Sequence, residues 1–202
     1  MRKLILLAAG MIAATPLALR AQMAGPAGAP KTWVSAYGLM YTGVSNLDDP
    51  DTSSRWRFDD NAFGFGASLQ RQLGTSLMIG VDASVARPEY ERRDLTTDIV
   101  AGRGTASIAT AMATGRYGYA GGGAIGFYLD GGIGMIAYRL EDLGFWNTDF
   151  ALQAGTGLEY RFDRNKAVAL EWGRTWGYHE EEDIGDGNQT HSRLKLALRL
   201  GF

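Results

Sequence analysis

The chain has 202 residues, a formal net charge of −2 at pH 7 and no cysteine. This length predicts one domain. The near balance of charge argues against a nucleic-acid-binding protein, and the absence of cysteine excludes structural disulfides and a cysteine-linked lipid anchor.

The N-terminal residues have the order of a secretory signal peptide. Arg2 and Lys3 precede an apolar run, which is followed by small residues ending at Ala21. We therefore predict that residues 1–21 form a signal peptide. An N-terminal membrane anchor is the alternative, although the apolar run is shorter than a spanning helix requires. Residues 22–31 are rich in Ala, Gly and Pro and are predicted to be a flexible lead-in.

Apolar and other side chains alternate along most of the remaining chain, as expected for strands, in which successive side chains point to opposite faces. No later apolar run is long and charge-free enough for a spanning helix. The alternating segments are residues 33–44, 56–73, 75–87, 103–117, 124–139, 147–162, 166–178 and 193–202.

For each predicted strand, hydrophobicity decides which of its two faces is the apolar one. In the first segment the apolar face is assigned to Tyr37, Leu39 and Tyr41, and in the fourth to Ile108, Thr110 and Met112. The alternation in the fourth segment is weaker, and its register stays open. In the last segment the pattern is strongest, and its apolar face comprises Leu194, Leu196, Leu198, Leu200 and Phe202.

The connections between these segments are sorted by length. Those after the second, fourth and sixth segments are short, and the others are longer and more charged. An even number of strands with short turns at one end and long loops at the other is typical of outer-membrane barrels. The predicted fold is thus all-β: an eight-stranded antiparallel up-and-down transmembrane β-barrel over residues 32–202. Closure requires the last strand to pair with the first.

Aromatic residues gather near both ends of the predicted strands, as they do at the two interfaces of a membrane. Trp33, Tyr160, Phe162 and Phe202 fall at the short-turn end. At the long-loop end are Tyr41, Phe58, Tyr138, Trp146, Phe150, Trp176 and Tyr178.

The faces opposite the apolar ones carry small, polar and charged residues. Because an eight-stranded barrel has room inside for little more than side chains, and buried charges must be paired, we predict a salt-bridged polar plug. Solvated charges in an open barrel or a soluble sheet are the alternative. Arg174 falls on the apolar face by parity, so either it reaches the membrane rim or a bulge shifts the register. The predicted interior charges are Asp82, Asp130, Glu159, Glu171, Arg161, Arg193, Lys195 and Arg199.

With these features the chain resembles the small OmpA-like and OmpX-like outer-membrane β-barrel proteins over residues 32–202. The resemblance implies localisation in the outer membrane of a Gram-negative-type bacterium and contact with outer-membrane lipid. It also implies that the alternating last strand, Leu194 to Phe202, is read by the outer-membrane assembly machinery. Function does not follow from it, because the family includes structural tethers, adhesins and enzymes.

Two histidines raise the possibility of catalysis. His191, Ser192, His179 and Glu180 supply the residue types of a hydrolase triad, and lipid A deacylases of this shape carry a similar set. In those enzymes, however, His and Ser are two residues apart and share a face. Here His191 and Ser192 are adjacent, so a strand would separate them. We predict no catalytic residues and no cofactor.

Acidic stretches at residues 48–51 and 179–188 contain oxygen ligands of the kind that bind Ca²⁺. Their spacing is not that of an EF-hand, and we interpret them as solvated loops without a metal site. A weak divalent-cation site that bridges surface glycolipid is the alternative. The predicted function is a non-catalytic structural or surface-interaction role through the long loops. A lipid-modifying enzyme and a soluble lipocalin-like binder are the two alternatives, and no surface ligand follows from the sequence.

Overall fold

The computed structural model describes residues 32–49, 53–59, 61–119, 124–141, 146–178 and 189–202. The predicted signal peptide and lead-in lie outside these residues. Among the residues described, no helix is long and apolar enough to cross a membrane. The strands are β1 (Thr32–Val44), β2 (Leu47–Asp49), β3 (Ser54–Phe58), β4 (Phe63–Gln72), β5 (Leu77–Ala86), β6 (Glu89–Asp94), β7 (Val100–Tyr119), β8 (Ile125–Leu140), β9 (Trp146–Arg161), β10 (Lys166–Tyr178) and β11 (Gln189–Gly201).

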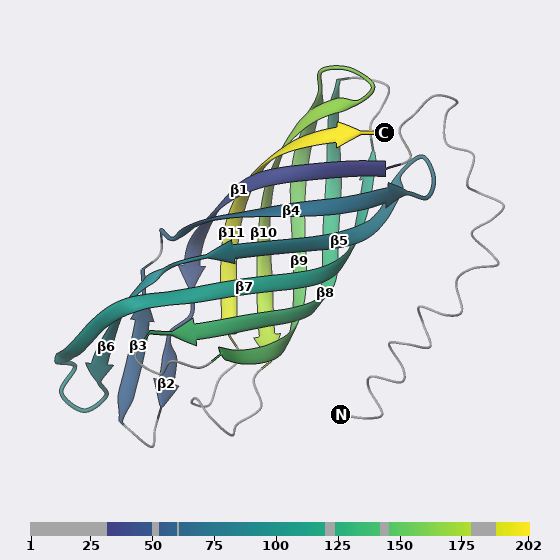
Figure 1. The fold of residues 1–202 in the computed structure, drawn as a ribbon. Helices are drawn as coiled ribbons and strands as arrows, with labels where there is room; N and C mark the ends of the chain where they lie inside the picture. The colour runs from purple at the N-terminus through teal and green to yellow at the C-terminus, as the bar shows by residue number, and fades with distance from the viewer. Residues whose placement is uncertain (1–31, 50–52, 60, 120–123, 142–145, 179–188) are drawn as a thin grey trace, which may run out of the picture.

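Eight of these strands form a closed antiparallel barrel, in the order β1-β4-β5-β7-β8-β9-β10-β11. The seam between the first and last strands runs from Trp33 opposite Gly201 to Val44 opposite His191, with one irregularity between Tyr41 and Gly43. The fold class and the predicted closure are thus confirmed. Figure 1 shows the start of β1 beside the C-terminus at one end of the barrel, which is the short-turn end.

The long-loop end carries a second sheet that the sequence did not predict. Strands β2, β3 and β6 pair in that order and join the first residues of β7 (Figure 1). The predicted second strand, residues 56–73, therefore consists of two strands, β3 and β4. Trp56, Phe58 and Tyr90 are buried beneath this outer sheet, and the rings of Phe58 and Tyr90 pack edge to face at 6.1 Å.

The barrel wall is apolar outside and mainly polar inside. A soluble lipocalin-like barrel would have the opposite arrangement, with its apolar faces pointing inward, so this alternative is wrong. The exposed apolar residues include the leucines of the last strand, Leu196, Leu198 and Leu200, together with Phe63, Phe65, Ile79, Val81, Phe127, Leu129, Leu158, Leu170 and Trp172.

Two strands face the opposite way from the prediction. In β1, Tyr37, Leu39 and Tyr41 point into the barrel, and in β7 so do Ile108 and Met112. The outward positions of these two strands hold mostly small residues, such as Ala36 and Gly38 in β1 and Ala109, Ala111 and Ala113 in β7. In β1 hydrophobicity misassigned the faces because tyrosine carries an apolar ring with a hydroxyl that can bond inside the barrel.

The aromatic girdles are present in part. Tyr160, Phe162 and Phe202 are exposed at the short-turn end, and Trp146, Phe150 and Tyr178 at the long-loop end. Trp176 is half-buried. The prediction was wrong for Trp33, Tyr41, Phe58 and Tyr138, which are buried.

Arg174 lies on the outer face of β10, as its position in the alternating pattern predicted. The pairing of β10 with both neighbours is regular through this residue, so no bulge turns it inward. Its guanidinium group donates a hydrogen bond of 3.3 Å to the hydroxyl of Thr190 on β11. The residue thus lies on the outer surface near the long-loop end.

Candidate functional site

The interior of the barrel holds the charged residues that strand parity selected. Arg161 differs from the rest, because 39% of its side chain is exposed at the short-turn end. The buried members are Asp82, Asp130, Glu159, Glu171, Arg193, Lys195 and Arg199.

Glu171 of β10 is the most connected carboxylate. One of its oxygens lies 3.3 Å from Nη2 of Arg116 and accepts a hydrogen bond of 3.2 Å from the hydroxyl of Tyr128. The other oxygen lies 3.5 Å from Nη2 of Arg193 and 3.6 Å from Nζ of Lys195. Lys195 is directly opposite Glu171 in the pairing of β10 with β11.

Glu159 of β9 is the second centre of charge pairing. It contacts the guanidinium groups of Arg199 on β11 and Arg161 on its own strand, the latter at 2.8 Å. Nη1 of Arg116 lies 3.6 Å from the same carboxylate. Arg116 therefore bridges the two carboxylates of Glu159 and Glu171.

Asp82 of β5 connects this group to the opposite wall. It accepts a hydrogen bond of 3.0 Å from Nζ of Lys195 and one of 2.7 Å from the hydroxyl of Tyr37. Asp130 accepts a hydrogen bond of 3.2 Å from the side-chain amide of Gln153. Each of these carboxylates thus has a buried donor.

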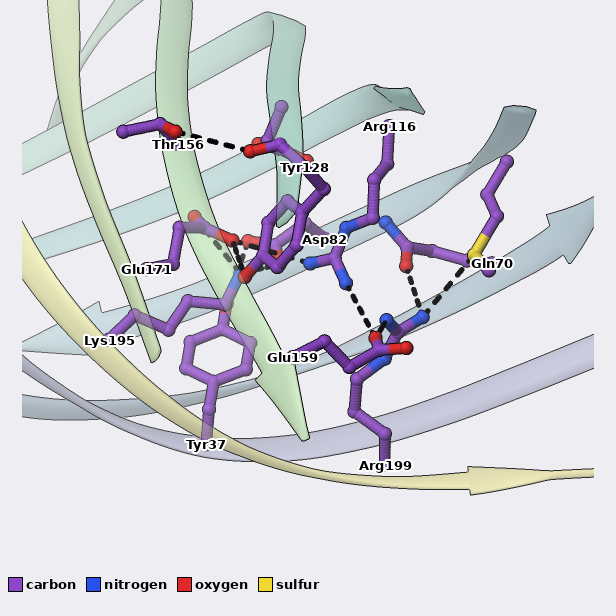
Figure 2. Close-up of polar contacts among 12 residues, drawn as sticks. Tyr37, Gln70, Asp82, Arg116, Tyr128, Thr156, Glu159, Glu171, Lys195 and Arg199 are labelled. Atoms are coloured by element: carbon purple, nitrogen blue, oxygen red, sulfur yellow. Dashed lines mark hydrogen bonds and ion pairs between the residues drawn. The ribbon is translucent and has the colours of Figure 1, made fainter. Parts of the chain in front are cut away.

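The pair of Asp130 and Gln153 stands apart from the rest. The other contacts, together with a hydrogen bond of 3.0 Å from Nη2 of Arg199 to Gln70, form one connected set that includes a residue from each of the eight barrel strands. Figure 2 shows these side chains converging between the walls. We call it the interior polar cluster; its members are Tyr37, Gln70, Asp82, Arg116, Tyr128, Glu159, Glu171, Arg193, Lys195 and Arg199.

Arg116 is the main residue of the cluster that sequence reasoning missed. It lies on β7, one of the two strands whose inward and outward faces were predicted the wrong way round. A signal was available, because Thr110, Thr114 and Arg116 share one parity and are all buried. Arg116 also lies directly opposite Asp130 in the pairing of β7 with β8. If the polar side chains had counted for more than Ile108 and Met112, the prediction would have placed Arg116 inside the barrel.

The long-loop half of the interior contains His191. Its Nε2 lies 2.7 Å from the hydroxyl oxygen of Tyr138, and its ring is tilted against that of Tyr41 with centroids 5.5 Å apart. The neighbouring Ser192 belongs to the other face of β11, as strand alternation requires. His191 and Ser192 therefore do not form a hydrolytic pair. His179 and Glu180 lie outside the described residues.

The described part of the chain contains no group of three His, Asp or Glu side chains that could hold a metal ion. The acidic stretch 179–188 lies outside it, as do residues 50–52.

The outer sheet has a charged outward face. Glu91 of β6 contacts Arg93 at 2.8 Å and Arg103 of β7 at 2.8 Å. Arg93 also contacts Asp98 at 3.2 Å. Hydrogen bonds from Arg93, and then from Arg103, lower the pKa of the Glu91 carboxyl from its ordinary value. Glu91 is thus held ionised between two guanidinium groups.

Comparison with known proteins agrees with the architecture. Residues 4–199 match the family described as "Outer membrane protein beta-barrel domain". The chain belongs to this family. Outer-membrane barrels lie in lipid, so the exposed apolar wall is the lipid-contacting surface of this family member. A comparison with curated protein sequences finds no significant match.

Two solved outer-membrane barrels share its fold. Neisserial surface protein A is 14% identical, with 87% of this chain and 99% of that chain covered at a TM-score of 0.57. The outer membrane protein OprG from Pseudomonas aeruginosa is 10% identical, with 86% and 94% covered at a TM-score of 0.55. At such identities the likeness concerns the fold.

Proposed function

We propose that the protein is a non-catalytic, non-conducting structural barrel of the outer membrane that presents its long-loop end for surface interactions. The observation that carries the proposal is the interior polar cluster, whose contacts reach all eight barrel strands. Such cross-links occupy the bore of a barrel that is only wide enough for side chains to fill. They also tie each wall strand to others that are not its neighbours.

Planar-bilayer recording of the refolded protein tests the absence of conduction. Insertion is verified separately by gel mobility in SDS without boiling, because a closed hydrogen-bonded barrel stays folded until heated. We expect inserted protein to give no steady single-channel steps. Steady, large steps from protein that passes the mobility control would contradict the proposal.

The surface role is supported by the charge of the outer sheet. Arg55, Arg57, Arg93 and Arg103 belong to its outward face, which they share with Glu89 and Glu91, and the side chains of Arg57 and Arg103 are exposed. Exposed guanidinium groups favour partners that carry phosphate, sulfate or carboxylate groups.

A binding assay with dextran sulfate and neutral dextran tests this role. We expect the protein in detergent micelles to bind the sulfated polymer at low salt and not the neutral one. Changing Arg57 and Arg103 together to Gln should weaken that binding, whereas Arg71→Gln at the short-turn end should not. If both variants bind dextran sulfate equally well, the outer sheet is not the contact surface.

A lipid-modifying activity is less well supported, because His191 points into the barrel and Ser192 lies on the opposite face. Mass spectrometry of lipid A from expressing cells provides the test. We expect no mass change on expression. A mass shift that disappears with Ser192→Ala would establish the enzyme and overturn the non-catalytic proposal.

A further inference from the structure

A small cavity lies at the short-turn end of the barrel interior. Its volume is about 30 Å³, and it is lined partly by Thr75 and Ser76 from the turn between β4 and β5. By this measure one water molecule needs on the order of 10–15 Å³, so the cavity has room for a monatomic ion and one water molecule.

The charged residues that line this cavity do not balance. Arg116, Arg161 and Arg199 contribute three positive charges, and Glu159 contributes one negative charge. Three minus one leaves a surplus of two positive charges. In Figure 2, Arg116 and Arg199 approach Glu159 from two sides. Further along the barrel axis, Glu171 contacts Arg116, Arg193 and Lys195, and Asp82 contacts Lys195, so the surplus is local to the cavity.

Several guanidinium donors of the arginines that line the cavity make no hydrogen bond. Nε and Nη1 of Arg116 and Nε of Arg199 are buried without a hydrogen-bond acceptor among the described residues. Only 6% of the Arg116 side chain and 1% of the Arg199 side chain are exposed. Buried donors without acceptors are costly, and more so when they are charged. An anion in the cavity would offer these donors an acceptor and would reduce the local surplus of positive charge.

We propose that this cavity is a binding site for a small inorganic anion of the size of chloride, held by Arg116 and Arg199 with Arg161 at its mouth. The site is independent of whether the barrel conducts, since it requires only access from the short-turn end. It differs from a water-filled cavity in one measurable way: its occupancy depends on the nature of the anion in solution.

A stability titration measures that dependence. The protein, refolded in detergent micelles, is unfolded with urea at constant sodium concentration while chloride replaces gluconate, which is too large for the cavity. A ligand that binds only the folded state raises stability in a saturable manner. We therefore expect the urea midpoint to rise with chloride and level off. Phosphate at the same ionic strength should give no such rise.

Gln72 provides a matched pair of variants because its side chain also lines the cavity. Both Gln72→Glu and Gln72→Met remove the hydrogen bond that its amide donates to the carbonyl of Gly74. Only Gln72→Glu adds a negative charge. We expect Gln72→Glu to abolish the chloride response and Gln72→Met to keep it. Loss of the response in both variants, or in neither, would overturn the proposal, as would a flat titration of the unchanged protein.

Crystals grown in sodium bromide locate the ion directly. We expect a peak of anomalous scattering between Arg116 and Arg199. Peaks confined to exposed arginines on the outer surface, with water alone in the cavity, would refute the site even if chloride were found to stabilise the protein.

Discussion

The hydroxyl group of Tyr37 donates a hydrogen bond of 2.7 Å to the carboxylate of Asp82 by reaching over Gly66. These residues belong to β1, β5 and the intervening strand β4. Any side chain at position 66 would occupy the space of the tyrosine ring. The glycine therefore allows a contact between strands that are not neighbours.

Gly66→Ala should destabilise the barrel, because the added methyl group overlaps the ring and hydroxyl of Tyr37. Overpacking of this kind costs about 1–3 kcal/mol. Urea unfolding of the refolded protein measures the change. Gly38→Ala on β1 is the control, since a methyl group there meets no atom within 4 Å and should leave the free energy of unfolding nearly unchanged. Equal effects of the two variants would contradict the steric explanation.

Glu171→Gln should be among the most destabilising single changes. It removes the charge that faces Arg116, Arg193 and Lys195 while keeping the shape of the side chain. Breaking a buried ion pair by removing one partner costs about 3–5 kcal/mol. The double variant Glu171→Gln with Lys195→Met should recover part of this loss, as a double-mutant cycle would measure.

Glu141→Gln serves as the control for Glu171→Gln. Its carboxylate is 60% exposed at the long-loop rim and lies 3.9 Å from Arg87. We expect a change in the free energy of unfolding within about 0.5 kcal/mol. A similar loss in both variants would mean that burial of the charge is unimportant.

Acid should weaken the outer sheet. The pKa of Glu91 is lowered below its ordinary value of 4.5 by Arg93 and Arg103, so the folded sheet binds protons less readily than the unfolded chain. The stabilisation is present above about pH 4.5 and is lost as the pH falls through the lowered pKa. We expect amide exchange in β6, corrected for its intrinsic pH dependence, to accelerate below pH 4.5.

A carbon-13 NMR titration of the Glu91 carboxyl reports its pKa directly. Arg93→Gln should raise that pKa toward the ordinary value, whereas Arg71→Gln at the other end of the barrel should have no effect. An unchanged titration in Arg93→Gln would show that the guanidinium contact is not its cause.

Phe202→Ser should impair assembly in cells more than refolding in the test tube. The backbone of Phe202 exchanges two hydrogen bonds with Thr32, and the substitution keeps both, while the exposed ring is lost. If the ring is part of the signal read by the assembly machinery, the amount of folded protein in the outer membrane falls and the detergent refolding yield does not. Equal losses in both measurements would indicate a purely structural role.

The leucines of β11 could be placed from sequence because their alternation is unbroken and the intervening side chains are mainly basic. The same reasoning failed for β1 and β7. In β1 the tyrosines have polar partners on distant strands, such as Asp82, which no local pattern contains. In β7 the contrast is between small and large residues, so hydrophobicity put Ile108 on the wrong side and left Arg116 out of the cluster.

The outer sheet escaped prediction for a different reason. Its strands are short, and β3 pairs with β6, which lies beyond the whole β4–β5 hairpin in the chain. Nothing in residues 54–58 alone shows that they leave the barrel wall. The prediction therefore merged residues 56–58 with β4 into one long segment.

The pairing of β1 with β11 also constrains how the protein reaches its membrane. Until the last residues of β11 are available, β1 keeps an open edge with unpaired backbone groups beside a wall of exposed apolar side chains. Open edges of this kind are templates for intermolecular pairing. The nearly complete chain is thus the form most prone to aggregate. Correct assembly therefore depends on keeping such chains apart from one another until β11 can pair with β1.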